Sequence, residues 1–213
     1  MTQLSNRRTV MTLYSNPADV LSHRVRMVLA EKNINHEIIN ITDEIPPELI
    51  EYNPYNTYPT LVDRDLSLYD AQVISEYLDE RFPHPPLMPV DPVGRATLKM
   101  IMIRIRNDWD PLVEKLIGKN DKQNVKQRKE LRDTLISVAP IFTQKPYFMS
   151  DEFTLIDCAL APTLWRLGEL SIELPQSAQP LIDYSERLFQ RESFKESLSD
   201  AEKDMIPLKI KDD

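Results

Sequence analysis

Short apolar runs alternate with helical patterns in the first part of the chain and predict a small mixed sheet covered by helices. The four runs that are typical of buried strands occupy residues 10–15, 36–41, 60–62 and 66–69. A helical pattern runs from Val20 to about Asn33, a short helix is expected up to about Tyr52, and a third helix follows Asp70, whose side chain can cap it. The short link between the last two strands requires an antiparallel hairpin. The predicted order is β-α-β-α-β-β-α.

The first of these helices has a polar side that carries Arg24, Arg26 and Lys32. His23 lies on the charged side. We therefore expect its imidazole to be solvated.

A turn-rich stretch, residues 53–59, leads directly into the third strand and ends in Tyr58 and Pro59. Proline cannot donate to a sheet ladder, so Pro59 is expected at the first position of the strand. An X-Pro bond in a tight turn before a strand is where a cis peptide bond is most plausible. We predict a cis Tyr58–Pro59 bond whose backbone faces a cleft. An ordinary trans proline that opens a strand is the alternative.

Five prolines lie within residues 83–92 and divide the chain. Such a run prevents both helix and sheet and favours a stiff, extended path. We predict an N-terminal domain over residues 8–83, a proline-rich linker over 84–92 and an all-helical domain over 93–208. Helical patterns after the linker occupy residues 94–117, 120–143, 154–165, 180–190 and 193–205, and the tail at 209–213 is expected to be frayed. Thr154 and Asp157 have the spacing of a capping box.

Composition narrows the possible functions. Only three glycines occur in 213 residues, so neither of the common Gly-rich phosphate loops can be built. The net charge of −8 opposes direct binding to nucleic acid.

The chain has a single cysteine, Cys158, which excludes an internal disulfide. It lies in an apolar stretch, which predicts an inert, buried thiol. The three histidines, His23, His36 and His84, have no metal-ligand spacing, so we expect no metal site. With no signal-peptide core and no apolar run long enough to span a membrane, we expect a cytoplasmic protein without a membrane partner.

Several stretches are similar to characteristic stretches of the glutathione S-transferase superfamily. Residues 13–15 with 22–32 (SHRVRMVLAEK) resemble its first strand and helix, residues 58–61 (YPTL) its cis-proline turn, and residues 153–157 (FTLID) the capping box that opens its buried helix. The resemblance covers nearly the whole chain. It implies an α+β, two-domain glutathione S-transferase-like fold, with a thioredoxin-like N-terminal βαβαββα domain that contains cis-Pro59 and a C-terminal all-α bundle.

A narrower group within this superfamily gives a closer match. Residues 76–90 (EYLDERFPHPPLMPV) and 144–153 (QKPYFMSDEF) closely resemble bacterial proteins of this fold that bind RNA polymerase and regulate transcription. The sequence departs from that group just downstream, where Asp91 replaces an expected aromatic residue and Gly94 an expected alanine.

The resemblance also indicates where a catalytic residue would lie. Glutathione transferases stabilise a thiolate with a hydroxyl group or use a cysteine nucleophile, and in the classes with a similar first helix that residue follows the first strand. The matching positions are Asp19, Val20 and Leu21. A carboxylate would repel the thiolate, and the two apolar residues have no donor. Tyr14 and Ser15 remain as possible donors, although Tyr14 is expected to pack beside the sheet.

The superfamily recognises the γ-glutamyl end of glutathione with an acidic residue followed by serine, and here Asp70 is followed by Ala71. The acid is retained and the hydroxyl is lost, while Asp70 can equally be a plain helix cap. We therefore expect no catalytic residue and no cofactor. We interpret Asp19, Tyr58, Pro59, Asp70 and Ala71 as vestigial positions of a glutathione site.

The proline-rich run contains the candidate binding surface, Pro83, His84, Pro85, Pro86 and Leu87. An imidazole held among prolines loses little entropy on binding, which favours a preformed surface for a protein partner. A stiff linker with an incidental histidine is the alternative. The resemblance implies that the partner is the RNA polymerase holoenzyme.

Residues 95–133 are a basic exception in this acidic chain. Such a run is usually a solvated helix face, but it could also line a dimer cleft or attract an anionic partner or nucleotide. The resemblance implies a homodimer across residues 95–117, or a heterodimer with a paralogue. The preferred interpretation is a non-catalytic transcription regulator of the starvation and stress response. The alternative is a glutathione-dependent transferase or reductase with an atypical active site.

Overall fold

The computed structural model describes residues 10–42, 44–117, 124–206, 208 and 210–211 of the chain. The chain divides into two compact units. The first runs up to Pro85 and also contains Glu196–Lys203, and the second contains Pro86–Lys195 and the chain after Asp204. Within the described residues, no helix is long and apolar enough to cross a membrane.

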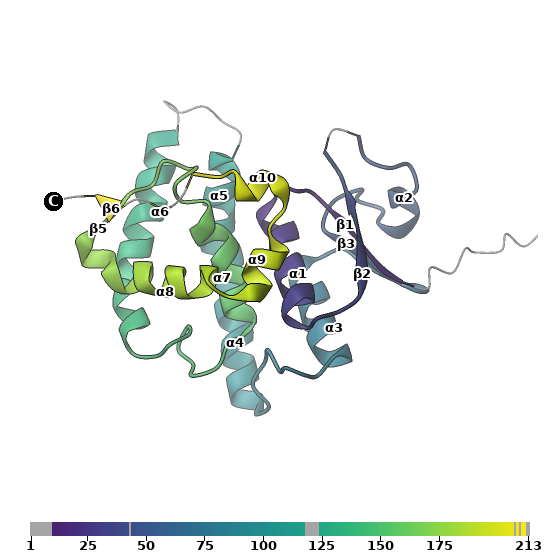
Figure 1. Cartoon of the computed structure of the whole chain (residues 1–213), viewed down its shortest axis with the longest axis horizontal. Coiled ribbons are helices and arrows are strands. Elements are labelled where there is room, and N and C mark those ends of the chain that lie inside the picture. The colour runs from purple at the N-terminus through teal and green to yellow at the C-terminus, as the bar shows by residue number, and fades with distance from the viewer. Residues whose placement is uncertain (1–9, 43, 118–123, 207, 209, 212–213) are drawn as a thin grey trace, which may run out of the picture. The chain divides into compact units, whose positions relative to one another are not determined.

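The first unit contains the predicted βαβαββα order. Its elements are β1 (Met11–Ser15), α1 (Val20–Glu31), β2 (His36–Asn40), α2 (Leu49–Tyr52), β3 (Thr60–Asp63), β4 (Leu66–Leu68) and α3 (Ala71–Arg81). The sheet order is β2-β1-β3-β4, with β1 parallel to β2 and the other two pairs antiparallel. Helices α1 and α3 cover one face of this sheet and α2 lies on the other (Figure 1). This topology is that of a thioredoxin-like domain.

Local signals in the first unit behave as predicted. The Tyr58–Pro59 bond is cis and immediately precedes β3. Asn33, just after α1, has the left-handed φ of 49° that asparagine tolerates. The Asp70 Oδ1 atom accepts hydrogen bonds from the backbone N–H groups of Gln72 and Val73, which caps α3. The predicted hairpin and caps are therefore confirmed.

The predicted solvation of His23 is wrong. His23 is fully buried, and Arg24 and Arg26 are almost fully buried. The Arg26 guanidinium donates to both carboxylate oxygens of Glu202, at 2.7 and 2.6 Å, and His23 Nδ1 lies 3.3 Å from the same carboxylate. The segment Glu196–Lys203 thus packs against α1 in the first unit. Glu202 gives the buried charges of α1 the close, hydrogen-bonded partner that a buried charge requires.

The second unit is helical, as predicted. Its helices are α4 (Pro92–Arg104), α5 (Asp110–Leu116), α6 (Val125–Val138), α7 (Leu155–Trp165), α8 (Gln179–Phe189) and most of α9 (Glu192–Ser197). A π-helical turn, Ile105–Trp109, separates α4 from α5, and Pro111 lies in the first turn of α5. The proline lacks the N–H group that would continue the α-helical ladder, so the single predicted helix is divided.

Three smaller pieces complete the described chain. The short strands β5 (Leu174–Pro175) and β6 (Ile210–Lys211) pair in parallel in the second unit, whereas α10 (Asp200–Lys203) belongs to the first unit. Most of the tail for which fraying was predicted lies outside the described residues.

Helix α7 forms the core of the second unit, and its first turn is the predicted capping box. Asp157 accepts a hydrogen bond from Thr154 N at 2.7 Å, and Thr154 Oγ1 accepts one from Ile156 N. The Tyr184 hydroxyl donates to Asp157 at 2.6 Å. Burial raises the pKa of the Tyr184 hydroxyl well above its usual value, and the adjacent carboxylate adds to this effect. Cys158, in the same helix, is buried as predicted.

Candidate functional site

Pro83, His84, Pro85 and Pro86 form a continuous run of exposed residues, which we call the proline segment. It follows α3, which ends at Arg81, and the His84–Pro85 bond is cis. Proline rings fix φ and leave the chain little freedom, so the exposed imidazole of His84 lies on a backbone with few accessible conformations. The segment therefore has the exposure and the stiffness that a preformed binding surface needs.

A buried lysine fastens the proline segment to the first unit. Lys32 follows the last residue of α1 and is only 6% exposed. Its Nζ donates to Asp79 Oδ1 at 2.6 Å, to the Phe82 carbonyl at 2.7 Å and to the Pro85 carbonyl. An ammonium group has three donors, and all three are used here. The carbonyls before and within the segment are thus held by one charge.

Leu87 is placed differently from its prediction. Its side chain is 1% exposed, and its carbonyl oxygen accepts a hydrogen bond from Leu155 N at 2.9 Å. An apolar side chain this deeply buried has no surface left for a partner to cover. Leu87 anchors the end of the segment within the second unit, and the contact surface is limited to the four residues before it.

The two departures downstream, Asp91 and Gly94, belong together. Asp91 caps α4, and its Oδ1 accepts a hydrogen bond from Gly94 N at 2.7 Å. A Cβ atom on residue 94 would lie 2.6 Å from Asp91 Oδ2 and 2.9 Å from Pro89 Cβ. Glycine at 94 therefore makes room for an aspartate cap at 91.

The glutathione-site positions lie at one end of the sheet. Tyr14, near the end of β1, pairs with Thr60 at the start of β3, and Leu68, at the end of β4, pairs with Leu61. The loops that carry Asp19, Pro59 and Asp70 leave or enter the sheet at this end. The fold therefore brings Asp19, Pro59 and Asp70 to the same end of the sheet.

None of the hydroxyl groups of Tyr14, Ser15 and Ser22 is exposed at this end of the sheet. Ser15, Ser22 and Tyr14 are each fully buried. Ser15 Oγ accepts a hydrogen bond from Arg26 at 2.6 Å, and Ser22 Oγ accepts one from Asn16 N at 3.1 Å. Tyr14 packs in the core beside Tyr52, with ring centroids 6.1 Å apart. A thiolate bound at the edge would find no exposed donor among these three residues.

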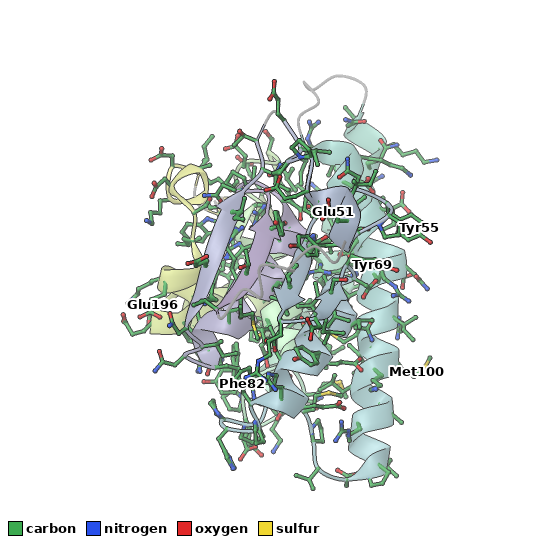
Figure 2. All side chains as sticks on the ribbon, turned by 90° about the vertical axis from the view of Figure 1, so that its right-hand side faces the viewer. Glu51, Tyr55, Tyr69, Phe82, Met100 and Glu196 are labelled. Atoms are coloured by element: carbon green, nitrogen blue, oxygen red, sulfur yellow. The ribbon has the colours of Figure 1, made fainter. Side chains whose placement is uncertain are left out.

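The remaining positions of this edge have structural roles. Asp19 caps α1 through a 2.6 Å hydrogen bond from Ser22 N, and Asp70 caps α3. Ala71 has no side-chain donor, so the γ-glutamyl site lacks its hydroxyl. Pro59 is buried and Tyr58 is half-buried. The nearby Tyr55 and Tyr69 rings, both labelled in Figure 2, pack edge to face with centroids 5.6 Å apart.

Comparison with known proteins relates this geometry to a family. Residues 20–81 match the family model of the glutathione S-transferase N-terminal domain, and residues 95–192 match that of the C-terminal domain. The fold resembles that of a tau class glutathione S-transferase from mango, with a TM-score of 0.80 over 92% of this chain and 96% of that one, at 18% identity. At that identity the likeness shows the fold alone.

The sequence match is closer. A stringent starvation protein A homolog from Pasteurella multocida is 48% identical over 200 residues, covering 93% of this chain and 94% of that protein. The chain belongs to the stringent starvation protein A family. Membership of this family confirms the narrower resemblance found in residues 76–90 and 144–153. A more distant relative, a probable maleylacetoacetate isomerase from Caenorhabditis elegans, is 29% identical over 182 residues, covering 80% of this chain and 84% of that protein.

Sequence reasoning missed Lys32, the residue that fixes the proline segment. The residue lies at the end of an amphipathic helix, where its residue type alone gives no sign of burial. Two of its three acceptors are backbone carbonyls, which leave no trace in residue type. Within the described residues, no three histidine, cysteine or acidic side chains come together as metal ligands.

Proposed function

We propose that this chain is a non-catalytic transcription regulator of the starvation and stress response that docks on RNA polymerase through the proline segment. DNA is held by the polymerase and not by this chain, whose net charge of −8 opposes binding to phosphates. Contact with the polymerase alters promoter use without a chemical step. The protein acts in the cytoplasm, where the polymerase is.

The observation that carries this proposal is the exposed proline segment held by the buried Lys32. Four consecutive exposed residues with a restricted backbone present an imidazole to a partner at a low entropic cost. Burying the Lys32 ammonium group costs several kcal/mol in lost hydration, as for other buried ions. A linker with no binding role would not need such a group to hold its backbone carbonyls in place.

The absence of catalysis is supported by the edge of the sheet where glutathione chemistry would occur. Ser15 and Ser22 are buried and hydrogen-bonded, and Ala71 replaces the serine that would complete γ-glutamyl recognition. Activating a thiol requires a donor or a positive charge beside the sulfur. The carboxylate of Asp19 has the opposite effect.

The alternative is a glutathione-dependent transferase or reductase. The observation that favours it is the intact framework of the site, with cis-Pro59 and the acidic Asp70 at the same end of the sheet. Retention on glutathione resin together with measurable thiol conjugation would support the alternative and count against the regulator. We expect neither.

Co-purification from cells tests the main proposal. The wild-type protein should retain RNA polymerase, and His84→Ala should retain much less. His36→Ala is the matched control, because it removes a partly exposed histidine from β2, outside the proline segment. Equal recovery of polymerase with wild type and His84→Ala would remove the docking proposal.

We also propose that the protein is a homodimer across residues 95–117. Within this range Met100 is 58% exposed and points away from α4 (Figure 2), and Ile117 is 37% exposed. A second copy would cover these side chains. Light scattering should give twice the 24.8 kDa mass of one chain, and Met100→Asp should shift the mass toward one chain. A monomeric wild type that dimerises only when mixed with a paralogue would favour the heterodimer.

A further inference from the structure

The basic stretch in the second unit contains a cavity that the docking surface does not use. Its volume is about 340 Å³, within the range of roughly 300–1,000 Å³ of small-molecule sites. One wall is α6, which contributes Arg128, Lys129 and Arg132. The other wall is the loop after α7, where Ser171 and Glu173 lie.

The three cationic side chains, Arg128, Lys129 and Arg132, all come from α6. Arg128 and Arg132 are four residues apart, so their side chains project from the same side of α6. The Arg132 side chain is 42% exposed, and its ion pair with Asp133 is long, at 3.4 Å. An exposed guanidinium whose ion pair is this long still has N–H donors that can bind a ligand oxygen.

The opposite wall is fixed by the backbone. Arg128 Nε donates to the Leu170 carbonyl at 2.9 Å, which ties the helix to the loop. Within the loop, Ser171 N donates to the Gly168 carbonyl and Ile172 N donates to the Leu167 carbonyl, at 3.0 and 2.8 Å. The loop is therefore held in place before any ligand arrives, and a ligand would not have to pay for its ordering.

The charges of the cavity indicate which ligand it takes. Three cations and the carboxylate of Glu173 give the cavity a net charge of about +2. This charge balances the charge of about −1.5 to −2 that a phosphate monoester carries at neutral pH. Arginine forks suit phosphate oxygens, and the Ser171 hydroxyl can donate a further hydrogen bond. Glu173 repels a second anionic group and accepts hydrogen bonds from hydroxyls, while Val125 and Ile172 supply apolar surface.

We propose that the cavity between α6 and residues 171–173 binds a small phosphate monoester with a hydroxylated body, such as a sugar phosphate. The phosphate lies against Arg128, Lys129 and Arg132, and the hydroxyls face Glu173. This site is independent of the proline segment and of the edge of the sheet. A long nucleic acid is a poorer fit, because the carboxylate in the cavity opposes a chain of adjacent phosphates.

Isothermal titration calorimetry with ribose 5-phosphate, and with ribose as the uncharged probe, tests the proposal. Ribose 5-phosphate should bind with a Kd of about 1 mM or below, and ribose should not bind. Lys129→Gln and Arg132→Gln should each weaken binding about tenfold, the effect of losing one hydrogen bond to a charged group. Lys126→Gln, which removes the same charge from an exposed position of α6 outside the cavity, should have no such effect.

Three outcomes would overturn the proposal. The first is no heat of binding for ribose 5-phosphate. The second is an equal loss of affinity in Lys126→Gln and Lys129→Gln, which would mean that only the general charge of α6 is sensed. The third is tighter binding of a single-stranded oligonucleotide than of ribose 5-phosphate. Lys129 is exposed, so its substitution is expected to leave the fold intact, and a lower affinity of Lys129→Gln can be attributed to the lost charge.

Discussion

The Lys32 ammonium donates to the Phe82 carbonyl oxygen over 2.7 Å, joining the end of α1 to the start of the proline segment fifty residues later. The same nitrogen donates to Asp79 and to the Pro85 carbonyl. Phe82 follows α3, and Figure 2 labels it. The shape of the proposed docking surface therefore depends on a residue that no partner would touch.

Lys32→Met should destabilise the protein and weaken docking together. Asp79 would be left buried without its cation, a loss expected to lower the free energy of unfolding by about 3–5 kcal/mol. Urea unfolding measures the stability, and binding to purified RNA polymerase measures the docking.

The double variant Lys32→Met with Asp79→Leu separates the two effects. Removing both charges avoids the unpaired carboxylate, so most of the lost stability should return. The Phe82 and Pro85 carbonyls would still lack their donor, so binding to polymerase should stay weak. If the double variant bound polymerase like the wild type, Lys32 would have no positioning role.

Gly94→Ala should destabilise the protein, although alanine is normally preferred to glycine in a helix by about 1 kcal/mol. The new Cβ would lie 2.6 Å from Asp91 Oδ2, so the cap of α4 must shift or be lost. The lost cap and the overlap with Pro89 Cβ at 2.9 Å should together cost about 2 kcal/mol, which leaves a net loss of about 1 kcal/mol in the free energy of unfolding. Thermal or urea unfolding measures it.

A double-mutant cycle with Asp91→Ala gives the control. Once the aspartate is absent, Gly94→Ala should cost less, because the contact with Pro89 is then the main remaining conflict. Additive effects of the two substitutions would contradict a coupling between Asp91 and Gly94.

Tyr77 is predicted to impose a dependence of stability on alkaline pH. Burial, and then the hydrogen bond from its hydroxyl to Asp63 at 2.6 Å, raise the pKa of Tyr77 to about 12. A raised pKa means that the folded state keeps this proton when the unfolded chain has lost it. The contribution of Tyr77 to stability is therefore complete below about pH 10 and is lost as the pH rises toward 12.

The comparison variant is Tyr77→Phe, which cannot ionise. The difference in unfolding free energy between wild type and variant should shrink between about pH 10 and about pH 12. A difference that stays constant or grows over this interval would show that the Tyr77 pKa is not raised in the folded protein.

Much of the fold could be predicted because its signals are local. The strands of the first unit, the caps at Asp70 and Thr154 and the turn at Pro59 each depend on residues a few positions apart. Local signals also indicated the end of the sheet where a glutathione site would lie. The Asp91–Gly94 pair has the same short spacing, and the capping role of the aspartate could have been recognised from it.

The charged interior of the first unit could not be predicted in this way. Arg26 and Glu202 are 176 residues apart, and an arginine on the polar side of a helix looks the same whether water or a distant carboxylate satisfies it. His23 was misplaced for the same reason, because its partners come from Glu196–Lys203. Lys32 depends on backbone carbonyls, which any residue supplies.

The affinity of purified RNA polymerase holoenzyme for wild type and for His84→Ala is the most direct test of the proposed function. His36→Ala and an unfolding curve for each variant serve as controls for the fold. The account predicts that His84→Ala folds normally and binds at least about fivefold more weakly, since exposed side chains that carry binding energy at an interface cost more than about 1 kcal/mol when truncated. Unchanged affinity in a folded His84→Ala variant, or no measurable affinity in the wild type, would contradict it.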